Sequence, residues 1–166
     1  MMFYCPDRHA REGFIRQFLD YYLYSWTKYG ELYVSDDMKT IASLVSVGAF
    51  EYKFSGKNAM KIRFNKNSGR IFIHREIVEG IANIVVPDNI EARVLTFYGT
   101  HGSQLNDVKP LVEELKVHAE EREFALVYET FSKRLIPFMQ EEGFETAYQK
   151  QFMDTQFIQT AMTYNI

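Results

Sequence analysis

The sequence predicts a mixed α/β domain, and three stretches carry that prediction. Residues 124–128 (FALVY) form a short apolar run with a β-branched centre, which is typical of a strand buried on both faces. Residues 108–119 repeat apolar side chains at helical spacing, which predicts an amphipathic helix. Residues 31–46 hold two strand-like runs around a polar turn. Strands and helices interleaved in this way indicate one sheet that is covered by helices.

The N-terminal half begins with a predicted helix and a hairpin. Asp7 is positioned to cap a helix that ends near Trp26, and its apolar stripe is the following: Ile15, Phe18, Leu19, Tyr22, Leu23 and Trp26. Strands are expected at 31–35 and 40–46 around the turn at 36–39. The next segment predicts strands at 61–65 and 71–74 and a short helix at 76–86.

The C-terminal half predicts a strand at 90–98, a polar loop at 99–107 and the amphipathic helix, with Asp107 as its cap. After the strand at 124–128, Ser132 is expected to cap a second helix, whose apolar residues are Leu135, Ile136 and Met139. Gly143 suits a left-handed helix stop. Two strands at 144–152 and 157–164 are expected to complete the sheet.

Composition limits the classes of function. A chain of 166 residues is expected to form one domain, residues 1–166. A net charge of −3 gives no electrostatic reason to bind nucleic acid or an anionic membrane. Cys5 is the single cysteine and the four histidines lack ligand spacing, so no metal site is expected. Without an apolar span or a signal-peptide pattern, the expected location is cytoplasmic.

Residues 124–144 (FALVYETFSKRLIPFMQEEGF) resemble the last third of the GNAT superfamily of N-acetyltransferases. The matching positions are Glu129, Thr130, Ser132, Pro137, Phe138, Gly143 and Phe144. A second match, residues 30–46 (GELYVSDDMKTIASLVS), resembles the second and third strands of that superfamily. The resemblance implies a GNAT-like fold with a twisted, mostly antiparallel sheet flanked by helices on both faces. It also implies two central parallel strands, at 91–98 and 124–129, that splay apart.

The resemblance implies a site for acetyl-CoA or another acyl-CoA as co-substrate, at residues 95–112. The superfamily motif Q/R-x-x-G-x-G/A would fall on residues 103–108, where this chain has SQLNDV and no glycine. A loop shifted toward Gly102 could still present N–H groups to a pyrophosphate, but an ordinary polar turn is the equal alternative. The cofactor-binding candidates are the following: Phe97, Gly99, Thr100, His101, Gly102, Ser103, Gln104, Asn106 and Ser132.

The resemblance also implies catalytic positions. Many GNAT enzymes protonate the leaving thiolate with a tyrosine four residues before the glycine of the Gly-Phe pair, and Met139 stands there. Tyr98 or Tyr128 could substitute, although either could simply pack in the core. Glu91 and Glu129 are the candidates for a general base. The predicted catalytic set is therefore Glu91, Tyr98 and Glu129.

Three functions stay open at the level of sequence. The first is an acyl-CoA-dependent N-acyltransferase that acetylates an unidentified amine, in a small molecule or a protein. The second is a catalytically inactive GNAT-like binding or regulatory module that still holds CoA. The third is a ligand- or partner-binding domain without CoA. A homodimer is compatible with each of them.

Overall fold

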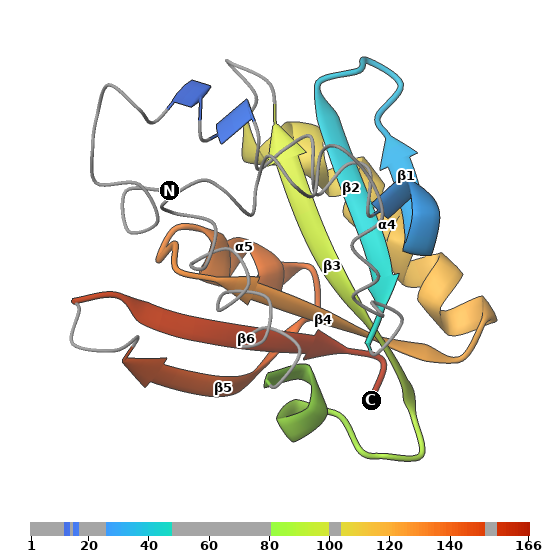
Figure 1. The fold of residues 1–166 in the computed structure, drawn as a ribbon, viewed down its shortest axis with the longest axis vertical. Helices are drawn as coiled ribbons and strands as arrows, with labels where there is room; N and C mark the ends of the chain where they lie inside the picture. Colours follow the sequence, from blue (N-terminus) through green and yellow to red (C-terminus); the bar gives the residue numbers. More distant parts are fainter. Residues whose placement is uncertain (1–11, 14, 17–25, 48–80, 100–103, 152–155) are drawn as a thin grey trace.

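The structure is a computed structural model that describes residues 12–13, 15–16, 26–47, 81–99, 104–151 and 156–166. Its centre is a six-stranded sheet with the strand order β1-β2-β3-β4-β6-β5 (Figure 1). The strands are β1 (Gly30–Val34), β2 (Thr40–Ser46), β3 (Glu91–Gly99), β4 (Phe124–Thr130), β5 (Glu145–Gln151) and β6 (Ile158–Tyr164). All six lie where the sequence predicts a strand, with ends shifted by one or two residues.

Neighbouring strands are antiparallel except β3 and β4, which are parallel. This mostly antiparallel sheet with a central parallel pair is the GNAT-like arrangement that the resemblance implies, and the predicted fold class is confirmed. The parallel pair forms because α4 (Leu105–Glu121) carries the chain back across the sheet between the two strands.

The two parallel strands separate after a short ladder. Their paired residues run from Glu91 with Phe124 to Leu95 with Tyr128. Beyond that point β3 stays paired with β2 as far as Gly99, and β4 stays paired with β6 as far as Thr130. We call the facing edges of residues 96–99 and 129–130 the wedge. The predicted splay of the two strands is confirmed.

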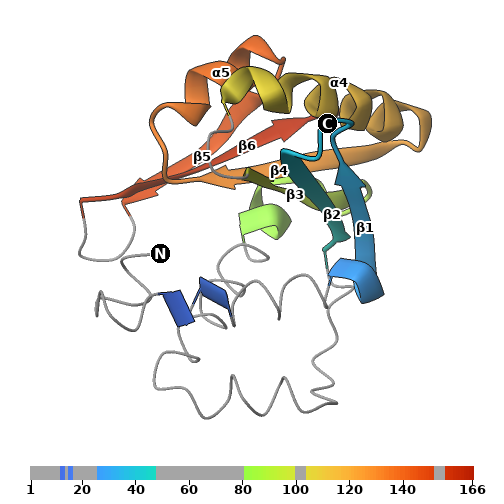
Figure 2. The ribbon, with the colours of Figure 1, turned by 90° about the horizontal axis from the view of Figure 1, so that it is seen from above.

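Helices α4 and α5 (Leu135–Glu141) cover one face of the sheet (Figure 2). The main core lies beneath them, where Leu111, Val112 and Leu115 of α4 meet Leu95 and Leu126. On the opposite face, Ala82 and Val86 pack against Ala125 and Val127, and the Trp26 ring lies 4.9 Å from the Tyr98 ring. Helical segments therefore cover both faces of the sheet, as predicted.

Both helix caps differ from the sequence predictions. α4 begins after Gln104 rather than at Asp107. Asp107 lies inside the first turn, where its Oδ2 accepts the Gln104 N–H at 2.7 Å. α5 begins after Arg134 rather than after Ser132. Ser132 instead donates its N–H to Thr130 Oγ1 at 3.0 Å and accepts from the Leu135 N–H through its carbonyl. The predicted stop at Gly143 is confirmed, with φ of 88°.

Several predictions fall partly or wholly outside the described residues. Within the predicted N-terminal helix, residues 12–13, 15–16 and 26 are described and helical. The strands predicted at 61–65 and 71–74 lie outside, and the helix predicted at 76–86 is described only from residue 81, where residues 81–85 are helical. In the described part of the chain, no helix combines the length and apolar character needed to cross a membrane.

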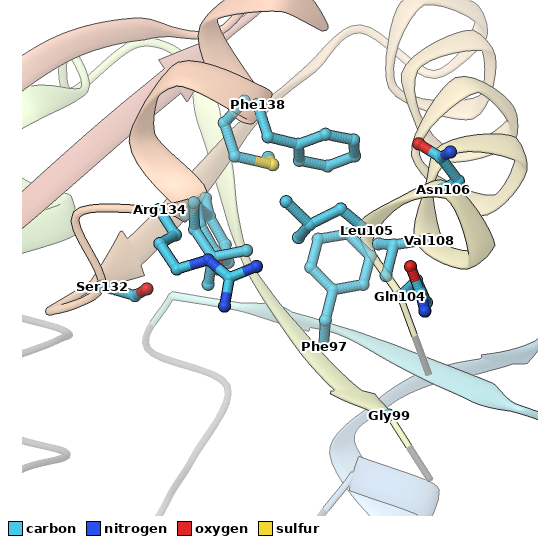
Figure 3. Close-up of a pocket in the computed structure, with 12 residues that line it drawn as sticks. Phe97, Gly99, Gln104, Leu105, Asn106, Val108, Ser132, Arg134 and Phe138 are labelled. Atoms are coloured by element: carbon cyan, nitrogen blue, oxygen red, sulfur yellow. The ribbon is translucent and has the colours of Figure 1, made fainter. Parts of the chain in front are cut away.

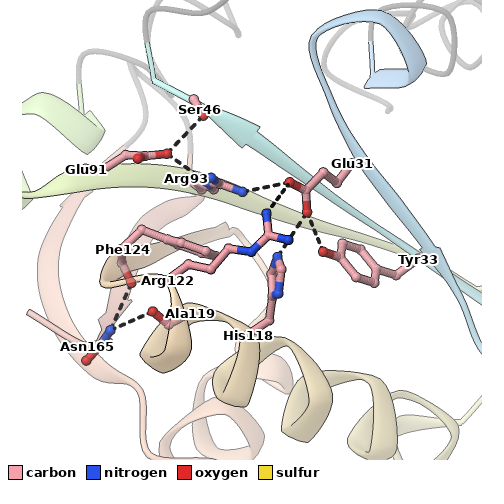
Figure 4. A network of polar contacts seen from close by, with 10 residues as sticks. All are labelled: Glu31, Tyr33, Ser46, Glu91, Arg93, His118, Ala119, Arg122, Phe124 and Asn165. Carbon is pink, nitrogen blue, oxygen red and sulfur yellow. Dashed lines mark hydrogen bonds and ion pairs between the residues drawn. The ribbon is translucent and has the colours of Figure 1, made fainter.

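A polar cluster joins β1, β3 and the last turns of α4 (Figure 4). We call it the Glu31 cluster; its members are Glu31, Tyr33, Arg93, His118 and Arg122. Arg93 Nη1 lies 3.0 Å from Glu31 Oε1, His118 Nε2 lies 3.1 Å from Glu31 Oε2, and Tyr33 donates to the same Oε2. Burial raises the pKa of Glu31, but the bonds from Tyr33 and His118 and the charge of Arg93 outweigh it and lower the pKa.

Candidate functional site

A cavity of about 650 Å³ lies between the start of α4 and α5, over the diverging ends of β3 and β4 (Figure 3). Its volume falls within the usual range of ligand pockets. The lining residues are Phe97, Gly99, Gln104, Leu105, Asn106, Val108, Tyr128, Ser132, Arg134, Leu135, Phe138 and Met139. Five of the predicted cofactor-binding residues therefore share one cavity: Phe97, Gly99, Gln104, Asn106 and Ser132. Helix α4 thus begins beside this cavity, within the range 95–112 where the resemblance implies a site.

The start of α4 supplies hydrogen-bond donors to this cavity. In any α-helix the first N–H groups have no acceptor within the helix, which here applies to Leu105 and Asn106. The Asp107 carboxylate accepts the Gln104 N–H, and the Asp107 N–H donates to the Gln104 carbonyl at 3.0 Å. The negative charge at the helix start is thus engaged in capping, while two N–H groups and the positive end of the helix dipole remain available to an anion.

Arg134 was not predicted from the sequence, yet its side chain reaches the cavity from the α5 side (Figure 3). It is exposed, and it forms no ion pair with any other described residue. Its neighbour Lys133 is exposed as well but does not line the cavity. The sequence signal for Arg134 was weak, because the conformation of the turn between β4 and α5 determines whether Lys133 or Arg134 faces α4.

The interior of the cavity is apolar and aromatic. The rings of Phe97 and Tyr128 lie 5.8 Å apart, and Phe138 and Met139 are buried beside them. Tyr128 is the one phenol among the described lining residues. Burial raises the pKa of Tyr128 to about 12, which outweighs the opposite effect of its hydrogen bond with Thr130. Tyr128 therefore carries its proton at neutral pH.

The three predicted catalytic residues do not line the cavity. Tyr98 and Glu129 follow Phe97 and Tyr128 by one residue, so strand alternation directs them to the opposite face of the sheet, on either side of the wedge. There Tyr98 packs on Trp26, and burial raises its pKa. Glu129 Oε1 accepts a hydrogen bond from Gln159 at 3.0 Å.

Glu91 lies at the other end of β3. Six residues separate it from Phe97, which corresponds to roughly 20 Å along a strand. Its carboxylate contacts Arg93 Nε at 2.8 Å and the Ser46 hydroxyl at 3.4 Å. The structure thus brings Tyr98 and Glu129 to one region and leaves Glu91 apart. Thr100, His101, Gly102 and Ser103 lie outside the described residues.

No protein-family model matches this chain, and no curated protein does. Among solved structures, it is similar to FeeM, an N-acyl amino acid synthase from uncultured soil microbes, with 10% identity and a TM-score of 0.45 over 77% of this chain and 66% of that one. It is also similar to Arabidopsis thaliana NAA60 in complex with acetyl-CoA, with 8% identity and a TM-score of 0.46 over 78% and 66%.

This chain therefore spans just under two thirds of the length of each of these two structures. At such low identity, neither likeness assigns an activity or a substrate to it. Within the ranges that the structure describes, no group of three or more His, Cys, Asp or Glu residues could hold a metal ion.

Proposed function

We propose that the chain binds an acyl-CoA, such as acetyl-CoA, in the cavity and transfers the acyl group to an amine. The observation that carries this proposal is the wedge: two parallel strands lose their mutual pairing directly beside a cavity that a helix start also lines. Backbone N–H and C=O groups at such an edge require partners. The amide groups of a pantetheine arm supply them, in the manner of an added strand.

The polar end of the cavity suits the phosphates of CoA. The Leu105 and Asn106 N–H groups and the Arg134 guanidinium approach it from two elements. A helix start and an arginine are both common phosphate ligands, because one offers aligned N–H dipoles and the other a planar pair of donors. Gln104 on the α4 side and Ser132 on the α5 side add polar side chains to the cavity (Figure 3). The phosphate-binding role of the loop at 99–107 stays a prediction, because residues 100–103 lie outside the described residues.

The acceptor amine would approach from the opposite face of the sheet, where Tyr98 and Glu129 border the wedge. The amine must lose a proton as it attacks the thioester carbonyl, and a carboxylate at this position could accept it. Glu129 is the better placed of the two predicted bases, because Glu91 lies at the far end of β3 and contacts Arg93. The identity of the amine is left open in this proposal.

A specific observation supports a second candidate function. Met139 lines the cavity at the position where the resemblance implies a proton-donating tyrosine, and a thioether cannot donate a proton. A chain that binds CoA without turning it over would be a binding or regulatory module. The two candidates share the cofactor site and differ in chemistry.

The binding half of the proposal is tested by titration calorimetry with CoA and acetyl-CoA. Arg134→Gln should weaken binding roughly 10- to 100-fold, since a hydrogen bond to a charged group contributes about 1.5–3 kcal/mol. Lys133→Gln is the matched control, because it removes the same charge from the adjacent exposed position outside the cavity. Equal effects of both substitutions, or no binding by the wild type, would overturn the proposal.

The catalytic half is tested by following CoA release from acetyl-CoA with a panel of amines. Turnover that depends on the amine supports the transferase. CoA binding without turnover of any amine in the panel supports the binding module instead.

A further inference from the structure

The deep part of the cavity is lined by large apolar and aromatic side chains. Tyr128, Phe138 and Met139 are buried there, with 6%, 9% and 1% of their surfaces exposed. Phe97 is half-buried, and its ring lies 5.8 Å from that of Tyr128. Leu105, at the start of α4, is half-buried as well and lies with Phe97 and Phe138 between the two helices (Figure 3). We call these five residues the apolar floor.

The charged and amide side chains of the cavity lie at its rim instead. Gln104, Asn106 and Arg134 are exposed, and they come from the beginnings of α4 and α5. Among the described residues, Thr40 Oγ1 and Ser43 Oγ are the buried side-chain polar atoms without a hydrogen-bond partner, and neither residue lines the cavity. The described apolar floor therefore leaves no buried polar side-chain atom in need of a partner from a ligand.

If an acyl-CoA lies in the cavity, as the proposed function requires, its parts divide between the rim and the apolar floor. The phosphates and the amides of the pantetheine arm need polar partners, which the rim and the wedge backbone supply. The acyl chain beyond the thioester carbonyl has no polar atoms. An acetyl group ends there in a single methyl group, which would cover little of five large side chains. A longer chain would remove more of this apolar surface from water, which is favourable.

Position 139 adds to the apolar character of this part of the cavity. The resemblance implies a tyrosine there, whose hydroxyl would bring a polar atom into the floor, whereas Met139 is apolar and unbranched. Methionine adapts its shape to irregular apolar neighbours, and an acyl chain is such a neighbour. On the basis of the proposed function, we infer that the apolar floor holds the acyl chain and that the preferred donor is an acyl-CoA with a chain longer than acetyl.

Titration calorimetry of the wild type with CoA, acetyl-CoA, butyryl-CoA and hexanoyl-CoA measures this preference. The Kd should fall along the series by up to roughly fourfold for each methylene group that is buried, the equivalent of about 0.8 kcal/mol. From acetyl-CoA to hexanoyl-CoA the total gain in affinity should be roughly 10- to 250-fold. CoA, which lacks an acyl group, is the reference within each series.

Variants test whether the gain in affinity comes from the apolar floor. Phe97→Ala removes a ring from the floor, so it should lower the gain from acetyl-CoA to hexanoyl-CoA several-fold and affect CoA less. Phe157→Ala is the matched control, because it makes the same substitution at an exposed residue that does not line the cavity. Met139→Tyr should also lower the gain, because a rigid ring with a hydroxyl replaces a flexible apolar chain. It provides a second test if Phe97→Ala does not fold.

The outcomes separate the acyl-chain preference from the proposed function. Equal Kd values for acetyl-CoA and hexanoyl-CoA in the wild type would overturn the role of the apolar floor and leave the acyl-CoA site standing. A loss of the gain in Phe157→Ala as large as that in Phe97→Ala would overturn it as well. Failure of the wild type to bind CoA or any of the acyl-CoAs would instead overturn the proposed function, and the acyl-chain preference with it.

Discussion

At the scale of single residues, a phenol on β4 and a thioether on α5 both line the cavity. They belong to Tyr128 and Met139, and Met139 has only 1% of its surface exposed. The core surrounds both side chains and fixes their positions. A substitution at either position should therefore change the chemistry of the cavity more than the packing around it. Of the two, Tyr128 carries a hydrogen-bond donor and Met139 does not.

The first prediction concerns position 139. Met139→Leu conserves volume, so it should cost less than about 1.5 kcal/mol of unfolding free energy and leave turnover nearly unchanged. Met139→Tyr should raise kcat, because it places a phenol where the resemblance implies a proton donor. CoA release at saturating acetyl-CoA measures both effects. A large loss of turnover from Met139→Leu alone would show that the Met139 side chain itself contacts the reacting group.

At the scale of elements, the beginning of α4 combines two opposing roles for Asp107. Its carboxylate caps the helix through the Gln104 N–H, yet it places a negative charge at the end of the cavity where phosphates are proposed to bind. The side-chain carbonyl of an asparagine at this position can accept the same Gln104 N–H, and asparagine is uncharged.

The second prediction follows from that opposition. Asp107→Asn should change the free energy of unfolding by less than about 1 kcal/mol and should tighten CoA binding several-fold, measured by calorimetry at low salt. Added salt should reduce the difference between variant and wild type, since screening weakens the repulsion that the substitution removes. Weaker CoA binding by this variant would place the phosphates away from the start of α4.

A second element-scale feature is the Glu31 cluster, which ties β1 and β3 to the end of α4. Hydrogen bonds and nearby cations lower the pKa of Glu31 below its ordinary value of 4.5 in spite of burial. A carboxylate with a lowered pKa in the folded state contributes stability above its unfolded pKa. That contribution disappears as the pH falls through the folded pKa.

The third prediction is therefore a loss of stability on acidification that depends on Glu31. Between about pH 5 and pH 3, the wild type should lose more unfolding free energy than Glu31→Gln, as measured by urea unfolding at each pH. Glu113→Gln provides the matched control, since it makes the same substitution at an exposed carboxylate on α4, 3.9 Å from Lys109 Nζ. Parallel pH profiles for wild type and Glu31→Gln would contradict the prediction.

At the scale of the whole molecule, the sequence predicted the order of elements better than the direction of side chains. The runs at 40–46, 90–98 and 124–128 have strand composition, and Gly143 ends α5 because the backbone there needs a positive φ. Strand composition and the need for glycine at a positive φ are local properties, so they can be predicted from the sequence. Of the predicted cofactor-binding residues, Phe97, Gly99, Gln104 and Asn106 within 95–112 line the cavity, and their role toward acyl-CoA stays a prediction.

What the sequence could not supply depends on pairs of distant elements. Alternation along β3 separates Phe97 from Tyr98, but only the packing of α4 and α5 decides which of them lines the cavity. Arg134 was missed because its direction depends on the turn after β4. Both caps were misassigned, because Asp107 acts from within the first turn of α4 and because the N-cap of α5 is Arg134, two residues after Ser132. A single domain, a homodimer and a cytoplasmic location stay predictions.

The fourth prediction concerns the stability of the entire chain. A ligand present at a hundredfold excess over its dissociation constant adds about 2.7 kcal/mol to the unfolding free energy. For a chain of 166 residues, each kcal/mol raises Tm by roughly 2–4 °C, so CoA should raise Tm by about 5–11 °C. Differential scanning calorimetry with CoA, and with adenosine as a ligand without phosphates, measures this shift. The same Tm with and without excess CoA would exclude tight binding.

The short ladder between β3 and β4, which contains five residue pairs, also connects two antiparallel parts of the sheet. It joins an antiparallel set of β1, β2 and β3 to an antiparallel set of β4, β6 and β5. A ligand in the wedge would strengthen this connection, because it would form hydrogen bonds to both sets beyond the last pair. The amide hydrogens of residues 96–99 and 129–130 that face the wedge should exchange with solvent in the free chain, and CoA should slow that exchange while leaving β1 and β5 unaffected.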